Sequence, residues 1–170
     1  MARTEPAPAV QQLDDLDIRV GLVCSGFHRA LTQALVDGAH THLFAAGLPR
    51  ERIDVFWVPG SFEIPQAARM LAVSGRYAAV VALGAVIRGE TSHFDHISMA
   101  VSQGLIRVSL DTGIPCAFGV LTCDSTAQAW ARAGGDVGNA GQDAAHAAVS
   151  LVNLAGLTLS GPRETPASEE

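Results

Sequence analysis

Short, continuously apolar runs alternate along this chain with longer segments in which apolar residues recur at helical spacing. The apolar runs predict four strands, at residues 18–24, 53–58, 78–87 and 115–121. The helical spacing predicts five helices, over residues 29–46, 61–75, 93–110, 125–133 and 141–157. The strands lack polar alternation, which is typical of strands covered on both faces. A strand followed by a helix is therefore the unit that repeats through the chain.

Strands joined by helices favour a parallel sheet, because each crossover brings the next strand back in the same direction. The expected fold is α/β: a single-domain, doubly wound, four-stranded parallel sheet of the flavodoxin-like kind, with helices on both faces. The two ends of the chain lack this periodicity. We expect an N-terminal tail at residues 1–16, the α/β domain at 17–158 and a C-terminal tail at 159–170.

The predicted helix over residues 93–110 is apolar on two sides. Its two stripes are Ile97, Val101, Leu105 and Val108 on one side and Met99, Ile106 and Leu110 on the other. A helix of this kind is buried on both sides. One side meets the sheet, and a second subunit is the preferred partner for the other. The alternative is a second contact within the same chain.

Composition narrows the class of protein. The chain has 170 residues, of which 48% are hydrophobic and only 16% are charged, so an apolar surface shared between subunits is expected. No apolar run reaches the ~20 residues that span a bilayer, and no membrane association is expected. The net charge is -6 and is concentrated in the two tails, which does not suit nucleic-acid binding.

The basic residues exclude two kinds of chemistry, and the cysteines bear on the location of the protein. Every basic residue other than histidine is arginine, so a P-loop and a lysine Schiff base are excluded. The three cysteines form no C-x-x-C motif, and no secretion signal opens the chain, so a cytoplasmic location is expected. Cys24 and Cys116 lie in apolar runs and are expected to be buried, unreactive side chains.

Candidate chemistry should come from the loops at the carboxyl ends of the strands, where such sheets bind ligands. The turn from Arg88 to Ser92 precedes a helix, whose free N–H groups and hydroxyls could bind an anion. From spacing alone, an ordinary strand-to-helix turn is the better interpretation. Ser92 with Asp95 resembles a capping pair, and Ser61 is an expected helix cap. His93 is a candidate general acid/base, whereas His93 and His96 lack zinc-ligand spacing, so no metal is expected.

Other strand-end residues have two interpretations each. Glu63 could bind a polar ligand edge, or it could neutralise a helix N-terminus. Phe27, Phe62 and Phe118 could stack on a flat ring, although a single ring of this kind is usually core. Arg132 could bind phosphate or compensate a helix dipole. Cys123 is a weak nucleophile candidate, and the spacing assigns no role to His28.

These loops resemble those of the lumazine synthase family. The matching segments are Val58-Pro59-Gly60-Ser61-Phe62-Glu63-Ile64-Pro65, residues 82–95 with Ile87-Arg88-Gly89-Glu90-Thr91-Ser92-His93-Phe94, residues 118–122, Arg132-Ala133-Gly134 and Gly138-Asn139-Ala140-Gly141. The likeness runs from Ile18 to Leu157. Such enzymes condense 5-amino-6-(D-ribitylamino)uracil with 3,4-dihydroxy-2-butanone 4-phosphate, losing phosphate and water, without metal or cofactor.

The resemblance implies a role for each matching position. His93 would be the catalytic proton carrier, and Phe27 would stack on the pyrimidine. Phosphate would lie at Glu90 and Thr91, with Arg132 as cationic partner. The remaining positions would hold the pyrimidine and the ribityl chain: Ser61, Phe62, Glu63, Ala85, Val86, Ile87 and Phe118.

The resemblance also implies assembly, with the active site between adjacent protomers. A homopentamer is expected. The short linker before the last helix permits a 60-mer icosahedral shell, and riboflavin synthase is a further candidate partner. One position departs from the family, which commonly has lysine where this chain has Ala140. The alternatives are a non-catalytic relative that binds ribityllumazine or riboflavin or forms a shell, and a different enzyme on the same scaffold, such as archaeal-type riboflavin synthase.

Overall fold

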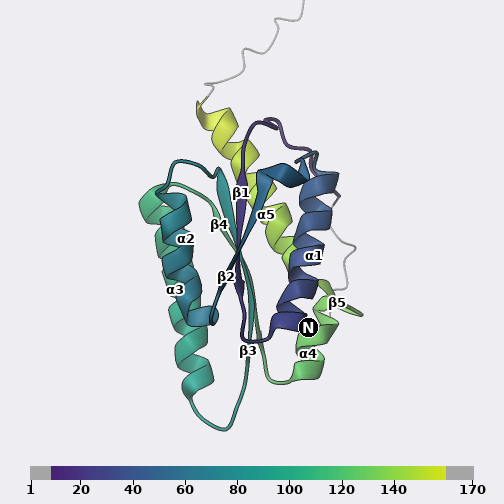
Figure 1. The fold of residues 1–170 in the computed structure, drawn as a ribbon, viewed down its shortest axis with the longest axis vertical. Coiled ribbons are helices and arrows are strands. Elements are labelled where there is room, and N and C mark those ends of the chain that lie inside the picture. Colours follow the sequence, from purple (N-terminus) through teal and green to yellow (C-terminus); the bar gives the residue numbers. More distant parts are fainter. Residues whose placement is uncertain (1–8, 160–170) are drawn as a thin grey trace, which may run out of the picture.

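The centre of the molecule is a four-stranded parallel sheet. The computed structural model describes residues 9–159. The strands are β1 (Val20–Ser25), β2 (Ile53–Val58), β3 (Ala79–Ile87) and β4 (Cys116–Cys123). They lie in the order β2-β1-β3-β4, and every neighbouring pair is parallel. Figure 1 shows the sheet nearly edge on, between two layers of helices. This is the flavodoxin-like order, so the predicted fold class is confirmed.

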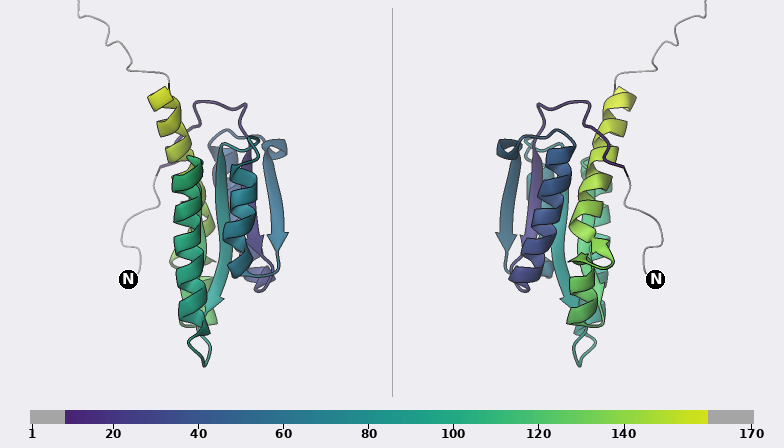
Figure 2. Two further views of the ribbon diagram at one scale, coloured as in Figure 1. Left: turned by 90° about the vertical axis from the view of Figure 1, so that its left-hand side faces the viewer. Right: turned by 90° about the vertical axis from the view of Figure 1, so that its right-hand side faces the viewer.

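Helices cover both faces of the sheet, as expected. They are α1 (Arg29–Ala45), α2 (Ile64–Ala72), α3 (His93–Thr112), α4 (Thr126–Ala131) and α5 (Ala140–Leu159). Figure 2 shows α2 and α3 in front of one face and α1, α4 and α5 in front of the other. Gly113 ends α3 with a φ of 72°, a left-handed conformation that glycine adopts without strain.

One local prediction at the start of α2 is wrong, and one small element was not predicted. Residues Ser61–Glu63 form a 3₁₀ turn rather than the start of α2, and Ser61 makes no capping hydrogen bond. Pro65 instead stands in the first turn of α2, where its missing N–H costs little. A small antiparallel hairpin of β5 (Ala133–Gly135) and β6 (Gly138–Asn139) precedes α5, and the apolar pattern gave no sign of it. A further 3₁₀ turn, Arg50–Arg52, precedes β2.

Each face of the sheet carries its own hydrophobic core. Leu22 of β1 packs toward α1 and α5, whereas the next residue, Val23, packs toward α2 and α3. Successive side chains of a strand point to opposite faces of the sheet, so a strand that contributes to both cores must be apolar at every position. This explains the continuous apolar runs.

Part of the predicted N-terminal tail lies against the domain. The Leu13 N–H donates to the Ala46 carbonyl oxygen over 2.9 Å, and the Asn153 side chain donates to the Gln12 carbonyl oxygen over 2.8 Å. Leu13 is buried. Residues 1–8 and 160–170 of the two predicted tails lie outside the described residues.

The two apolar stripes of α3 have different surroundings. Val101 and Leu105 are buried against the sheet and α2, and Val108 is also buried. Met99, Ile106 and Leu110 are 59%, 57% and 76% exposed. The alternative of a second contact within the chain is therefore wrong as far as the described residues go. The exposed stripe is free to contact another protomer.

Candidate active site

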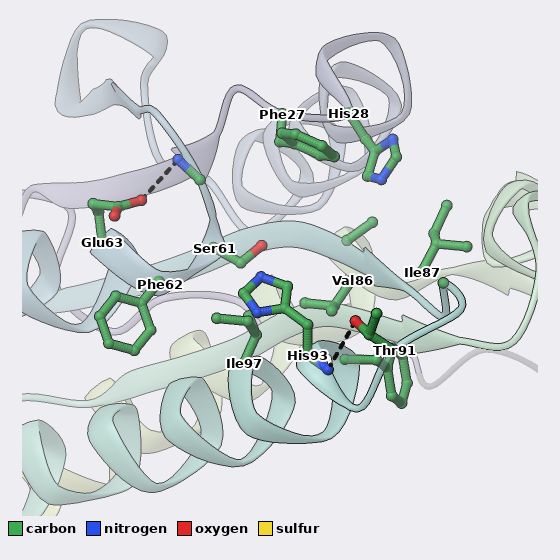
Figure 3. A pocket seen from close by; sticks show the side chains of 14 residues that line it. Phe27, His28, Ser61, Phe62, Glu63, Val86, Ile87, Thr91, His93 and Ile97 are labelled. Carbon is green, nitrogen blue, oxygen red and sulfur yellow. Dashed lines mark hydrogen bonds between the residues drawn. The ribbon is translucent and has the colours of Figure 1, made fainter.

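A pocket of about 690 Å³ opens at the carboxyl ends of β1, β2 and β3 (Figure 3). Helices leave the sheet toward opposite faces after β1 and β3, and such a reversal leaves a crevice between the two loops. Three loops and the start of α3 therefore line the pocket. The lining residues are Phe27, His28, Gly60, Ser61, Phe62, Glu63, Ala85, Val86, Ile87, Gly89, Thr91, His93, Phe94 and Ile97.

The turn after β1 contributes an aromatic ring. The Gly26 N–H donates to the Val58 carbonyl oxygen over 2.8 Å, which ties this turn to the end of β2. Phe27 is 79% exposed, and its ring meets the ring of His28 edge to face, with 4.9 Å between centroids. A ring this exposed stabilises the fold little and is available to stack on a ligand.

The turn after β2 contributes a carboxylate and a hydroxyl. Glu63 Oε2 accepts a hydrogen bond from the Gly60 N–H over 2.9 Å, which holds the carboxylate in place (Figure 3). Ser61 is buried, whereas Phe62 is 60% exposed. This bond occupies one oxygen of Glu63, and the other oxygen has no hydrogen-bond partner among the described residues.

The end of β3 and the loop after it form the third side. Ala85 is buried, and Val86 and Ile87 are half-buried at the pocket wall. Thr91 Oγ1 accepts a hydrogen bond from the His93 N–H at the start of α3, over 3.4 Å. Ser92 is the N-cap but makes no capping bond, so the predicted Ser92–Asp95 capping pair is wrong. Asp95 instead forms an ion pair with Arg88.

His93 enters the pocket from the first turn of α3. Figure 3 shows its ring directed into the cavity, with Phe27 and His28 on the opposite side. The ring makes no hydrogen bond or ion pair to any residue that the structure describes, so both nitrogens are available to a ligand. A histidine placed in this way can act as a general acid or base toward a ligand in the pocket.

Three predicted site residues lie outside this pocket. Phe118 is on the edge strand β4 and is 45% exposed. Arg132 follows α4, where its Nη1 donates to the Gln128 carbonyl oxygen over 3.0 Å. Glu90 is exposed in the loop after β3 and is not among the lining residues. One chain therefore brings most of the predicted residues together, but not these three.

Three lining residues had not been singled out as ligand contacts: Gly60, Phe94 and Ile97. Ile97 follows His93 by one helical turn, so the helical period places both on one face, and this signal could have identified it. His28 also lines the pocket, although its spacing had given it no role.

The cysteines are not candidates for chemistry. Burial raises the pKa of Cys24 to about 12 and that of Cys116 to about 11. Burial also raises the pKa of Cys123, although Arg132 lowers it. All three thiols are unpaired. The thiolate is the reactive form, so a nucleophilic role for Cys123 has no support.

The described residues contain neither a metal-binding cluster nor a membrane-spanning helix. No three histidine, cysteine or carboxylate side chains come together there in a way that could hold a metal ion. Over the same residues, no helix combines the length and the hydropathy that crossing a membrane requires.

The fold is that of a flavodoxin-like α/β protein with a pocket at the carboxyl edge of its sheet. The family model of 6,7-dimethyl-8-ribityllumazine synthase matches residues 17–156, and the chain belongs to this family. It is a family of transferases in riboflavin biosynthesis.

Proposed function

We propose that the chain is an active lumazine synthase, joining 5-amino-6-(D-ribitylamino)uracil to 3,4-dihydroxy-2-butanone 4-phosphate. One observation carries this proposal. A single pocket gathers Phe27, the Ser61–Glu63 turn, the end of β3, Thr91 and His93, which are the positions that the family motifs supply. They match a flat, polar pyrimidine with a hydroxylated chain and a second, anionic reactant.

The proposed chemistry needs binding and proton transfer more than a protein nucleophile. The amine of the pyrimidine attacks the ketone of the phosphorylated reactant and forms an imine, releasing one water. Phosphate then leaves, and ring closure releases the second water. His93 carries protons between these steps. Holding both reactants in one pocket supplies much of the remaining acceleration.

The phosphate site in this proposal includes residues of a second protomer. Thr91 and the first-turn N–H groups of α3 offer donors to the anion. Arg132 and Phe118 lie outside the pocket of their own chain, and both are on the exposed β4–α4 side. A homopentamer, packed through Met99, Ile106 and Leu110, would bring them to a neighbour's pocket. The 60-mer shell and riboflavin synthase remain proposals of the same kind, as does the cytoplasmic location.

A non-catalytic relative is the second candidate function. Ala140 favours it, because the family commonly has lysine there and the missing cation would weaken phosphate binding. The pocket residues His93 and Glu63 favour the enzyme. Purified protein mixed with both substrates distinguishes the two. Lumazine absorbance with equal phosphate release supports the enzyme, and tight lumazine binding without turnover supports the binding protein.

Subunit mixing tests the shared site. Neither His93→Ala nor Arg132→Ala alone should retain more than a few per cent of activity. Denaturing and refolding the two variants together should restore part of it, because some pockets would then combine an intact His93 with an intact Arg132. Failure to recover activity, with oligomers formed normally, would place Arg132 outside the neighbour's pocket.

A further inference from the structure

Arg88 joins three elements around the loop that carries Thr91 and His93. It is the first residue after β3, and its N–H donates to the Cys123 carbonyl oxygen over 2.9 Å. Its Nε donates to Asp124 Oδ1 over 2.8 Å. Its two terminal nitrogens lie 3.2 and 3.3 Å from the carboxylate oxygens of Asp95. One guanidinium therefore connects the end of β4 to the first turn of α3.

An aromatic ring contacts the same guanidinium. The Arg88 carbon Cζ lies 4.1 Å from the centroid of the Phe94 ring. Phe94 also lines the pocket, next in sequence to His93. A planar cation that lies over a ring and also bonds two carboxylates has few orientations left. Lysine could not reproduce this arrangement, because its ammonium is a single point.

The loop has few other restraints. Ser92 makes no capping hydrogen bond, and the bond between the His93 N–H and Thr91 Oγ1 is long at 3.4 Å. Gly89 has open space around it, with nothing within 4 Å of an added Cβ. Arg88 is thus the principal connection between this loop and the rest of the fold.

The contacts of Arg88 with Asp95, Asp124 and Phe94 form a network at the protein surface, and this exposure limits its contribution to stability. The Arg88 side chain is 43% exposed, and ion pairs this open to solvent add little to the free energy of folding. Their effect is therefore on the geometry of the loop. Small displacements of a catalytic group cost far more in rate than such an ion pair contributes to stability.

We propose that Arg88 is a positioning residue, which uses Asp95, Asp124 and Phe94 to hold Thr91 and His93 in the geometry needed for phosphate binding and proton transfer. This inference rests on the proposed function for its kinetic consequences. Its structural consequence, a fixed loop, stands independently and is measured separately.

The kinetic test is the variant Arg88→Gln. We expect kcat to fall by about tenfold to 100-fold, the range that a displaced catalytic group produces. The KM for the phosphorylated ketone should rise severalfold, because Thr91 moves. The KM for the pyrimidine should stay within about twofold of wild type, since Phe27 and the Ser61–Glu63 turn do not belong to this loop. Arg88→Lys should recover only part of kcat.

Two further variants separate positioning from a general loss of stability. Arg19→Gln removes a matched arginine, half-exposed and bidentate to Asp54, at the opposite end of the sheet. It should leave both KM values and kcat unchanged. Asp124→Asn should produce a smaller kcat defect, and the double variant with Arg88→Gln should be no worse than Arg88→Gln alone.

Hydrogen–deuterium exchange of the segment 88–98 measures the loop without substrate. We expect Arg88→Gln to accelerate exchange there by about an order of magnitude, with the β1 and β2 segments unchanged. Unchanged exchange in this segment, wild-type kinetics, or an equal loss in Arg19→Gln would each overturn the inference. If the wild-type protein forms no lumazine, the proposed function fails, and exchange alone decides whether Arg88 holds the loop.

Discussion

Gly141, at the start of α5, packs directly against the main chain of Leu35 in α1. A Cβ atom at Gly141 would overlap the Leu35 carbonyl group. The neighbouring Asn139 reinforces this approach, because its Nδ2 donates to the Ala34 carbonyl oxygen and its Oδ1 accepts from the Gly141 N–H, both over 2.9 Å. The two helices can be this close only because position 141 has no side chain.

Gly141→Ala should therefore destabilise the protein, although alanine is ordinarily the better helix former. Overpacking costs about 1–3 kcal/mol, and more where backbone must move. Gly156→Ala is the matched control in the same helix, because nothing lies within 4 Å of an added Cβ there. That change should stabilise by about 0.5–1 kcal/mol. Chemical denaturation measures both. Equal effects would mean that the two helices are not in contact at Gly141.

The fold could be predicted from the sequence because its main signals are local. Each strand contributes side chains to two cores and is therefore an unbroken apolar run in the sequence. Accordingly, β2 begins and ends at the predicted residues. The β5–β6 hairpin was missed because its two strands contain only five residues, three of them glycine, and so have no apolar periodicity to detect. The 3₁₀ turn before Pro65 was missed because a serine in that place usually caps a helix.

The site could be predicted only in part, for a different physical reason. Parallel topology brings strand ends together, so Phe27, Glu63 and His93 were expected to meet, and they line one pocket. The location of Phe118 and Arg132 depends on how β4 and α4 lie relative to the other loops, and periodicity carries no information on that. The Arg88 network depends on side-chain directions around a loop, which the pattern of apolar positions likewise does not determine.

The position of Ala140 relative to Arg132 allows a gain-of-function test. The Ala140 N–H donates to the Arg132 carbonyl oxygen over 2.8 Å, so a cation at position 140 would lie beside the proposed phosphate-binding arginine. Ala140→Lys should lower the KM for the phosphorylated ketone severalfold and leave the KM for the pyrimidine unchanged. Steady-state kinetics with each substrate varied in turn provides the measurement. Ala140→Gln is the control for side-chain length. A change of equal size in Ala140→Gln would argue against a charge effect.

The three thiols should resist modification in the folded protein. With a pKa of about 12, Cys24 is thiolate in only about 10⁻⁴ of molecules at pH 8. Cys24 and Cys123 are also buried. A maleimide reagent should therefore label the native protein orders of magnitude more slowly than the protein in denaturant, where all three react. Mass spectrometry counts the labels. Rapid labelling of Cys123 in the native protein would show that Arg132 affects the pKa of this thiol more than burial does.

The stability of the protein should fall as pH falls below about 6.5, partly because of His42. Its ring is buried between α1 and α5, edge to face with the ring of His146 at 5.3 Å. Neither of its ring nitrogens has a hydrogen-bond partner among the described residues. Burial, and next the charge of His146, lower the pKa of His42, whereas Asp143 raises it.

The sign of the effect follows from proton binding. Below the ordinary pKa of 6.5, the unfolded state binds a proton that the folded state does not, so acid favours unfolding until the lowered pKa is reached. Within this window one such group removes up to about 1.4 kcal/mol per pH unit. Above the ordinary pKa of 6.5, His42 adds no pH dependence to the stability. Burial also lowers the pKa of His40, which contributes a separate part of the same slope.

Denaturant unfolding of wild type and His42→Leu at pH 7.5 and 5.5 tests this prediction, at one protein concentration because assembly shifts apparent stability. His42→Leu should lose less stability between the two pH values than wild type does. His146→Leu should show an intermediate loss, because it removes one cause of the shift but leaves His42 buried. If His42→Leu loses as much stability between pH 7.5 and pH 5.5 as wild type does, the acid sensitivity belongs to other groups, His40 first among them.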